Sequence, residues 1–498
     1  MSFLKIGWAE VDITPDKKVA LDGQFAERIS QYVEKPITVT AMAVDSGDDQ
    51  LVMCSVDLVM VRSGLVQEIR ERLSDNNLGI DPSKVCFSVI HTHTAPVVGN
   101  GANVTSVTSG FRTLLEEYMP KDKKYVDSAP VNDDPDVMKP NEYYAFLVER
   151  CVAVVLQAWE NRKPGTFTNA FGRAAVGLCR RVVFSDGSAQ MWGDTYRATF
   201  EELEGGNDSG IELLFVYGEN KKVTGIVVNI ACPAQCVQHR HFISPDFWGE
   251  VRVLLRQYFG EDLFVLSQCS AAGDQCPVDL VRWVEPESDL NDPNLTRVDT
   301  PKRKADPSMF DLVGMRRVGK RIAREIIDVY EEGLEEPQAD VEFTHVVRNY
   351  ELPLRRVTLE DAAKARQVIK TYMQEKDGDL DYNDAAKLQI HLGTLRRLKL
   401  QDTKDVHNTE VHIIRMGNVA FATNPFELFL DYGNKIKARS PAEQTFLVQL
   451  ANGADGYLPT AKAERGGHYS AFVSSGNVGH AGGEQLVRQT LNDIKKLF

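Results

Sequence analysis

Short apolar runs that alternate with amphipathic helical segments constrain this chain more than any other feature. Runs with strand character lie at 50–57, 85–90, 211–217, 223–230 and 263–267. Helical periodicity separates or follows them at 65–73, 142–159, 247–258 and 312–330. Strands that alternate with helices predict an α/β fold with mixed sheet order, and 341–354 and 410–423 predict antiparallel additions. We expect one large mixed-sheet domain with flanking helices over residues 1–498.

Four further stretches add detail to the predicted fold. Residues 359–400 are rich in Ala, Lys, Arg and Gln and predict two amphipathic helices joined at Asp377-Gly378-Asp379, an inserted αα-hairpin without chemistry of its own. Ser185-Asp186-Gly187 predicts a β-hairpin. The proline-punctuated stretches 120–140 and 285–307 are long for connections and predict lids or mobile surface. No internal repeat is visible in the sequence.

The net charge and the composition limit the kinds of molecule that this protein is expected to bind. The 498 residues carry a net charge of −14, which repels a phosphate backbone and an anionic membrane surface. No window approaches the roughly 18 apolar residues of a membrane span, and no secretory signal opens the chain. The eight cysteines show no closely spaced framework. We expect a cytoplasmic protein with reduced thiols, a small-molecule substrate, no nucleic acid and no stable membrane association.

Two histidines stand at the end of one apolar run. Residues 85–96 read VCFSVIHTHTAP, so His91 and His93 are one residue apart where the run stops. Side chains at i and i+2 of a strand share a face, which would place both rings in one pocket. Imidazole is both a common metal ligand and the usual proton carrier near neutral pH, so the pair is a candidate for metal binding or catalysis.

Other polar groups follow predicted strands. Cys232 lies in Ala231-Cys232-Pro233, with His239 and His241 close behind, and Asp274 and Cys276 lie in the loop after 263–267. Ends of strands are where open α/β sheets keep their sites. Near the C-terminus Glu427 opens an apolar segment, and Tyr457 and Tyr469 flank a glycine-containing stretch. The sequence has no P-loop, GxGxxG, HExxH or GxSxG motif, which disfavours nucleotide binding and the serine hydrolase elbow.

Together these segments resemble the catalytic domain of the neutral/alkaline (non-lysosomal) ceramidases over nearly the whole chain. Residues 7–15 (GWAEVDITP) look like that family's opening motif, and residues 91–96 (HTHTAP) are similar to its Thr-His-Thr-His-Ser-Gly-Pro signature. Residues 273–277 (GDQCP) look like its Gly-Asp-Val-Ser-Pro loop, and Tyr457 and Tyr469 match the spacing of its two active-site tyrosines. The resemblance implies a divergent cytoplasmic member that lacks the family's C-terminal immunoglobulin-like domain.

The resemblance also implies roles for individual residues. His91, Glu427 and Tyr457 would bind zinc or another divalent metal, His93 would carry the proton, and Tyr469 would donate to the oxyanion. Asp274 and Cys276 fall in the family's catalytic loop, and Arg180 or Arg181 falls near its substrate-contacting arginine. Where the family has its second histidine ligand this chain has Cys232, and where it has the loop serine the chain has Cys276.

Three hypotheses follow from these departures. The first is a metal-dependent amidohydrolase in which the Cys232 thiolate, a good zinc ligand, completes the metal site. If Cys232 is no ligand, either His239 or His241 takes its place or the metal is lost. The second is a metal-free enzyme with Cys276 as nucleophile, and the third is a binding protein that has lost catalysis. Without export signal or additional domain, ceramide is a poor candidate, and a small soluble amide or sugar-like substrate fits better.

Overall fold

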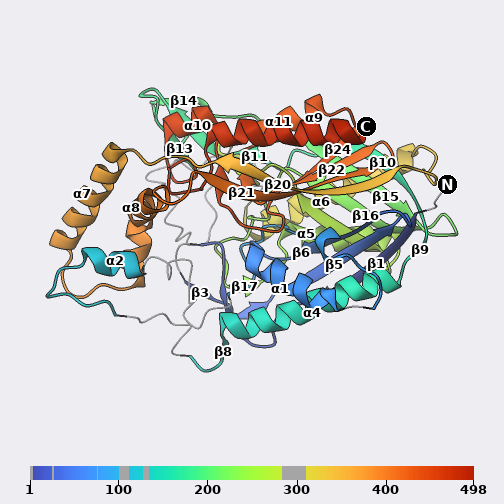
Figure 1. Ribbon diagram of the computed structural model, residues 1–498, viewed down its shortest axis with the longest axis horizontal. Helices are drawn as coiled ribbons and strands as arrows, with labels where there is room; N and C mark the ends of the chain where they lie inside the picture. The colour runs from blue at the N-terminus through green and yellow to red at the C-terminus, as the bar shows by residue number, and fades with distance from the viewer. Residues whose placement is uncertain (1–3, 25–26, 76, 100–111, 127–133, 283–309) are drawn as a thin grey trace.

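Three main sheets form the framework of this computed structural model, which describes residues 4–24, 27–75, 77–99, 112–126, 134–282 and 310–498 (Figure 1). The first has the order β7 (Val85–Val89), β6 (Gln50–Val56), β5 (Thr38–Asp45), β1 (Lys5–Asp12), β9 (Lys163–Pro164). The second has the order β10 (Thr166–Arg173), β15 (Gly210–Tyr217), β16 (Val223–Ile230), β18 (Phe264–Cys269). The third has the order β20 (Phe343–Pro353), β21 (Val406–Met416), β22 (Val419–Thr423), β24 (Gln444–Val448).

The three sheets share one topology. In each, four strands that follow one another along the chain pair antiparallel, antiparallel and then parallel. A helix connects the two parallel strands, and a longer helix follows the last strand. These pairs of helices are α1 (Ser63–Ser74) and α4 (Pro140–Glu160), α5 (Phe247–Phe259) and α6 (Asp311–Glu332), and α9 (Leu430–Arg439) and α11 (His480–Leu497). The fold thus contains a repeat that the sequence does not display.

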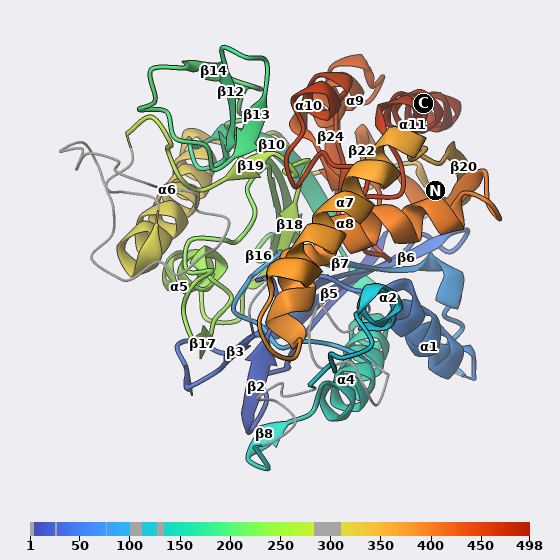
Figure 2. The ribbon, with the colours of Figure 1, turned by 90° about the vertical axis from the view of Figure 1, so that its left-hand side faces the viewer.

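The apolar residues form a layered core. The inner faces of the three sheets meet in one cluster that includes Trp8, Phe167, Leu266, Phe421 and Phe446. The outer face of each sheet packs against its own pair of helices, so Figure 2 shows helix pairs on three sides of the strands. Strands buried on both faces read as continuous apolar runs, which is why these strands were recognisable in the sequence.

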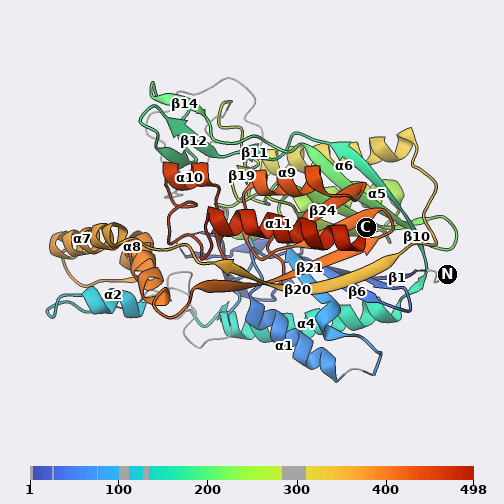
Figure 3. The ribbon, with the colours of Figure 1, turned by 45° about the horizontal axis from the view of Figure 1, so that its top comes forward.

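A helical lobe projects from one end of the sheets, opposite the chain termini (Figures 1 and 3). It contains α2 (Arg112–Tyr118), α7 (Leu359–Glu375) and α8 (Tyr382–Leu400), which share a separate apolar cluster. Gly378 turns the α7–α8 connection with a positive φ of 74°. Val473 joins this cluster from the segment that follows Tyr469, so the lobe borders the C-terminal part of the candidate site.

Short strands and helices complete the fold. A small antiparallel sheet has the order β13 (Ala189–Met191), β12 (Arg181–Phe184), β14 (Phe200–Leu203). Further short pairings join β11 (Leu178–Cys179) to β19 (Gln275–Cys276), β4 (Tyr32–Val33) to β17 (Phe242–Ile243), and β2 (Lys18–Leu21) to both β3 (Arg28–Ile29) and β8 (Val137–Met138). The single turns are η1 (Pro82–Lys84) and α10 (Ala461–Gly466). No helix in the described ranges is long and apolar enough to cross a membrane.

The predicted α/β fold class is confirmed, including the αα-hairpin over 359–400 and the β12–β13 hairpin at Ser185-Asp186-Gly187. One expectation about local structure was wrong. The strand that leads to the histidines ends at Val89, and His91 has a φ of 63°, so both histidines lie in a loop beyond the ladder. Residues 285–307, and part of 120–140, lie outside the described residues.

The contact between Gly225 of β16 and Trp8 of β1 provides a test of the shared core. A Cβ at position 225 would overlap the indole ring. We expect Gly225→Ala to lower the free energy of unfolding by about 1–3 kcal/mol, the usual cost of overpacking. Denaturant unfolding followed by circular dichroism measures this. Gly64→Ala is the control, since a Cβ there meets open space in α1, and equal stabilities of the two variants would contradict the packing described.

Candidate active site

Six of the ten residues expected to form the site line one cavity of about 170 Å³. They are His91, His93, Arg180, Glu427, Tyr457 and Tyr469. The remaining wall comes from Asp22, Gly23, Gln24, Val59, Met60, Trp192, Gln235 and Gln238. The cavity lies where parallel strands of all three sheets end, since His91 follows β7, Gln235 follows β16, and Glu427 follows β22.

The histidine loop presents its rings to the cavity and its threonines to the opposite side. The hydroxyls of Thr92 and Thr94 both donate to the Ser244 carbonyl, at 2.8 and 2.9 Å. On the cavity side, His91 Nδ1 lies 2.8 Å from the Val59 carbonyl oxygen. A carbonyl can only accept, so Nδ1 carries a proton, and the tautomer protonated there presents Nε2 to the cavity as an acceptor, 3.3 Å from His93 Nε2.

Glu427 and Tyr457 are neighbours by strand register. β23 (Glu427–Leu428) and β25 (Tyr457–Leu458) pair in parallel, with Glu427 opposite Tyr457. Glu427 Oε2 lies 3.5 Å from His91 Nε2. Burial, together with the nearby Glu427 carboxylate, raises the pKa of the Tyr457 phenol well above its ordinary value, so this hydroxyl is a proton donor at neutral pH.

Gln235 connects Arg180 to His93 and is the residue that the sequence analysis missed. Arg180 Nη1 donates to Gln235 Oε1 at 3.0 Å, and Gln235 Nε2 lies 2.8 Å from His93 Nε2. A guanidinium only donates, which sets the orientation of the amide, so Gln235 donates to His93. Burial, then the nearby His91 and arginines, lowers the pKa of His93 well below its ordinary value. No motif marked Gln235, because a glutamine near a strand end carries no spacing signal.

Arg180 and Arg181 are adjacent in the sequence, but only Arg180 lines the cavity. Arg180 is 2% exposed, lines the cavity, and donates from Nη2 to the Gly273 carbonyl at 3.0 Å. Its Nη2 also lies 3.5 Å from the Tyr457 hydroxyl. Arg181 does not line the cavity and instead binds Glu204 and the segment around Tyr469. Tyr457 and Tyr469 face each other with ring centroids 5.9 Å apart.

Cys232, expected as a metal ligand, is not brought to the cavity. Its side chain belongs to the apolar cluster beneath β16, and Sγ donates to the Val176 carbonyl at 3.3 Å. Burial also raises the pKa of this thiol well above its ordinary value. Nor do the alternatives reach the cavity: His239 stacks on Phe310, and His241 is exposed and does not line the cavity.

Asp274 and Cys276 also lie outside the cavity wall. Asp274 Oδ1 accepts from the Leu430 amide at the start of α9, at 2.9 Å, and burial raises the pKa of this carboxyl to about 6. Cys276 is fully buried beside Trp192, and its Sγ donates to the Val278 carbonyl at 3.3 Å. Burial raises the pKa of the Cys276 thiol to about 12. Both residues therefore support the loop and helix that frame the cavity.

The side chains of the cavity can be compared with what a divalent metal ion requires of its ligands. No group of three or more His, Cys, Asp and Glu side chains in the described ranges is arranged to hold an ion. His91 Nε2 and Glu427 Oε2 nevertheless face each other as two acceptors 3.5 Å apart, which requires a proton or a metal ion between them. A tetrahedral zinc ion with bonds of about 2.1 Å separates its ligands by about 3.4 Å. His91 and Glu427, with Tyr457 beside them, fit a three-donor site without Cys232.

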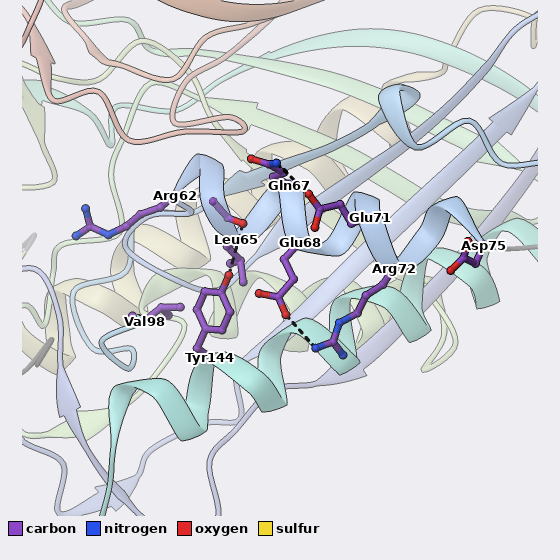
Figure 4. Close-up of a pocket in the computed structure, with 11 residues that line it drawn as sticks. Arg62, Leu65, Gln67, Glu68, Glu71, Arg72, Asp75, Val98 and Tyr144 are labelled. Atoms are coloured by element: carbon purple, nitrogen blue, oxygen red, sulfur yellow. Dashed lines mark hydrogen bonds and ion pairs between the residues drawn. The ribbon is translucent and has the colours of Figure 1, made fainter. Parts of the chain in front are cut away.

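Larger cavities lie elsewhere. One, about 780 Å³, lies on the outer surface of α1 and α4, where Figure 4 shows Glu68 paired with Arg72 and Gln67 with Glu71. A second, about 640 Å³, lies between α1 and β21 and contains the pairs Arg70–Glu410 and His407–Asp455. The ion pairs Glu68–Arg72, Arg70–Glu410 and His407–Asp455 join opposite charges in these cavities. In the cavity of about 170 Å³, the acceptors His91 Nε2 and Glu427 Oε2 lie together with the buried guanidinium of Arg180.

Comparison with known proteins supports the fold. No family model matches the sequence, and no curated protein matches it significantly. A ceramidase complexed with C2 aligns with 100% of this chain and 75% of its own, with a TM-score of 0.67 and 13% identity. The neutral ceramidase from Pseudomonas aeruginosa aligns with the same shares, with a TM-score of 0.65 and 15% identity. The chain therefore has a ceramidase-like fold, and its chemistry must be inferred from the residues of the site.

Burial of the cysteines leads to a direct prediction. All eight thiols are buried, and at pH 8 a thiol with a pKa of about 12 is ionised on the order of 10⁻⁴. We expect the native protein at pH 8 to react negligibly with a thiol-specific disulfide reagent, and the denatured protein to titrate eight thiols. Rapid modification of Cys276 in the native protein, located by peptide mass spectrometry, would contradict the environment described.

Proposed function

We propose that this protein is a hydrolase that cleaves an amide, or a related carbonyl bond, of a small substrate with the help of a divalent metal ion, zinc being the first candidate. The observation that carries the proposal is the His91–Glu427 pair. It places two acceptors face to face in a cavity that also contains a buried guanidinium and two tyrosines. The ceramidase-like fold gives independent support, because proteins with that name hydrolyse an amide bond.

In this proposal the metal would be held by His91, Glu427 and Tyr457. Hydrogen bonding of His91 Nδ1 to the Val59 carbonyl orients the ring, as carbonyl partners commonly do for metal-binding histidines. When bound, the ion would polarise the scissile carbonyl and lower the pKa of a water molecule. A catalytic zinc commonly has three protein ligands and an open position, so the set needs no contribution from Cys232.

The remaining cavity residues handle protons and developing charge. A neutral His93 can accept a proton from the attacking water at Nε2, once Gln235 releases that nitrogen. Tyr469 donates a hydrogen bond to the carbonyl oxygen as it becomes negative, and the Arg180 charge stabilises that oxygen in surroundings where little water screens it. Trp192 and Met60 provide apolar wall against which a small substrate packs.

The other two hypotheses differ in what they require. A Cys276 nucleophile requires a thiolate at the cavity, whereas this thiol is buried outside the wall with a raised pKa. A binding protein without catalysis requires the cavity but no turnover. A substrate with long chains would need more room than about 170 Å³. These facts favour short N-acyl compounds as the first substrates to test.

We expect Tyr469→Phe to reduce kcat on the best short N-acyl substrate by about 10²–10³-fold, the usual cost of one oxyanion donor. The change removes only a hydroxyl, so the fold should be retained, which circular dichroism checks. Tyr258→Phe is the control, because Tyr258 pairs with Glu331 on the surface of α5. Full activity in Tyr469→Phe would exclude the assigned role.

The metal part of the proposal has its own test. Protein purified with zinc present should contain about one ion per chain by elemental analysis, and His91→Ala or Glu427→Gln should remove it. Cys232→Ala is the matched control and should retain the ion. Wild-type protein without metal would refute metal assistance, and loss of metal in Cys232→Ala would refute the assigned ligands. Hydrolysis that is abolished by a chelator and restored by zinc would connect the ion to catalysis.

A further inference from the structure

One small sheet supplies both a wall of the cavity and the support of Tyr469. Arg181 begins β12 and Arg180 directly precedes it, and consecutive side chains of an extended segment point to opposite sides. Arg180 points to the cavity, whereas Arg181 points to the segment 463–470, which includes the end of α10 and Tyr469. The two arginines therefore have separate roles although they are adjacent.

Arg181 is fully buried and binds that segment at three points. Nη1 donates to Ser470 Oγ at 2.9 Å, and Nη2 donates to the carbonyls of Gly467 at 2.9 Å and Ala463 at 3.3 Å. Glu204, which follows β14, neutralises the guanidinium through Nε at 2.5 Å and Nη2 at 3.0 Å. The planar guanidinium group can donate to acceptors that lie in several directions, whereas the single ammonium group of a lysine cannot reach all of them.

The bound segment is one that would not adopt its conformation unaided. Gly467 and His468 have positive φ values of 76° and 74°, and His468 is not a glycine. Backbone of this kind persists only where surrounding contacts hold it. The Met191 amide of β13 donates to His468 Nδ1 at 3.1 Å, and Arg355 donates to the Ala471 carbonyl at 2.7 Å. Arg181 contacts the residues on both sides of the His468–Tyr469 pair.

We infer that the Arg181–Glu204 pair is a positioning device that holds the Tyr469 hydroxyl at the cavity. This inference rests on the proposed function for its catalytic consequence, but its structural content can be measured without a substrate. Arg181 touches neither the cavity nor a substrate, so it is a positioning residue and not a catalytic one.

The structural test uses 3-fluorotyrosine placed at position 469 and ¹⁹F NMR of the full-length protein. We expect a single resonance in the otherwise wild-type chain and a shifted or broadened one in Arg181→Lys and in Ser470→Ala. Ser470→Ala removes one acceptor and leaves the Arg181–Glu204 pair in place. Arg256→Lys is the control, since Arg256 binds Glu10 and the Leu263 carbonyl away from the cavity. An unchanged resonance in both test variants would overturn the inference.

The kinetic test asks whether Arg181 acts through Tyr469. A displacement of about 1 Å costs on the order of 10²-fold in rate, so we expect Arg181→Lys to lower kcat to that extent with little change in KM. In a Tyr469→Phe background the same substitution should have no further effect on kcat, because the group it positions is gone. Additive losses would overturn the inference. If no substrate is turned over, the proposed function fails, and the ¹⁹F result still decides the inference.

Discussion

The shared apolar core of the three sheets is the constraint on which the rest of the structure depends. Each sheet is buried on its inner face by the other two and on its outer face by helices, so polar side chains on the central strands need partners there, as Asn229 has in Gln268 and the Leu447 carbonyl. The polar groups of the cavity lie where the parallel strands end, and the repeated topology brings three such ends together. His91, Gln235 and Glu427 follow strands of the three different sheets and meet in one cavity.

Within that cavity, the side chains differ in role chiefly because of which atoms donate and which accept hydrogen bonds, and less because of the distances between them. His91 uses Nδ1 to bind the Val59 carbonyl and turns Nε2 toward His93 Nε2 and Glu427, whereas Gln235 donates to Nε2 of His93, so two histidines of one motif differ chemically. Arg180 determines the orientation of Gln235 and also donates to the Gly273 carbonyl. A buried guanidinium thus organises the polar side of the cavity, next to Tyr457.

Several residues that motif comparison associates with the chemistry support the site from outside. Asp274 accepts from the amide that begins α9, Arg181 binds the segment before and after Tyr469, and Cys232 fills apolar space beneath β16. Of two residues adjacent in sequence, such as Arg180 and Arg181, one lines the cavity and the other supports it from outside, because adjacent side chains of an extended chain point in opposite directions. A departure from a family motif at a supporting position, such as Cys232, therefore need not alter the chemistry of the cavity.

The sequence by itself determined the α/β class, the helical hairpin and most long elements, because strands buried on both faces and amphipathic helices leave local patterns that need no partner to be read. It also marked His91, His93, Glu427, Tyr457 and Tyr469, which lie in recognisable motifs. Only the tertiary structure decided that β1 and β5 join the first sheet, that Arg180 and not Arg181 lines the cavity, and that Gln235 enters where Cys232 was expected. These outcomes depend on the direction of side chains after a strand ends and on partners over a hundred residues away, which no local pattern records.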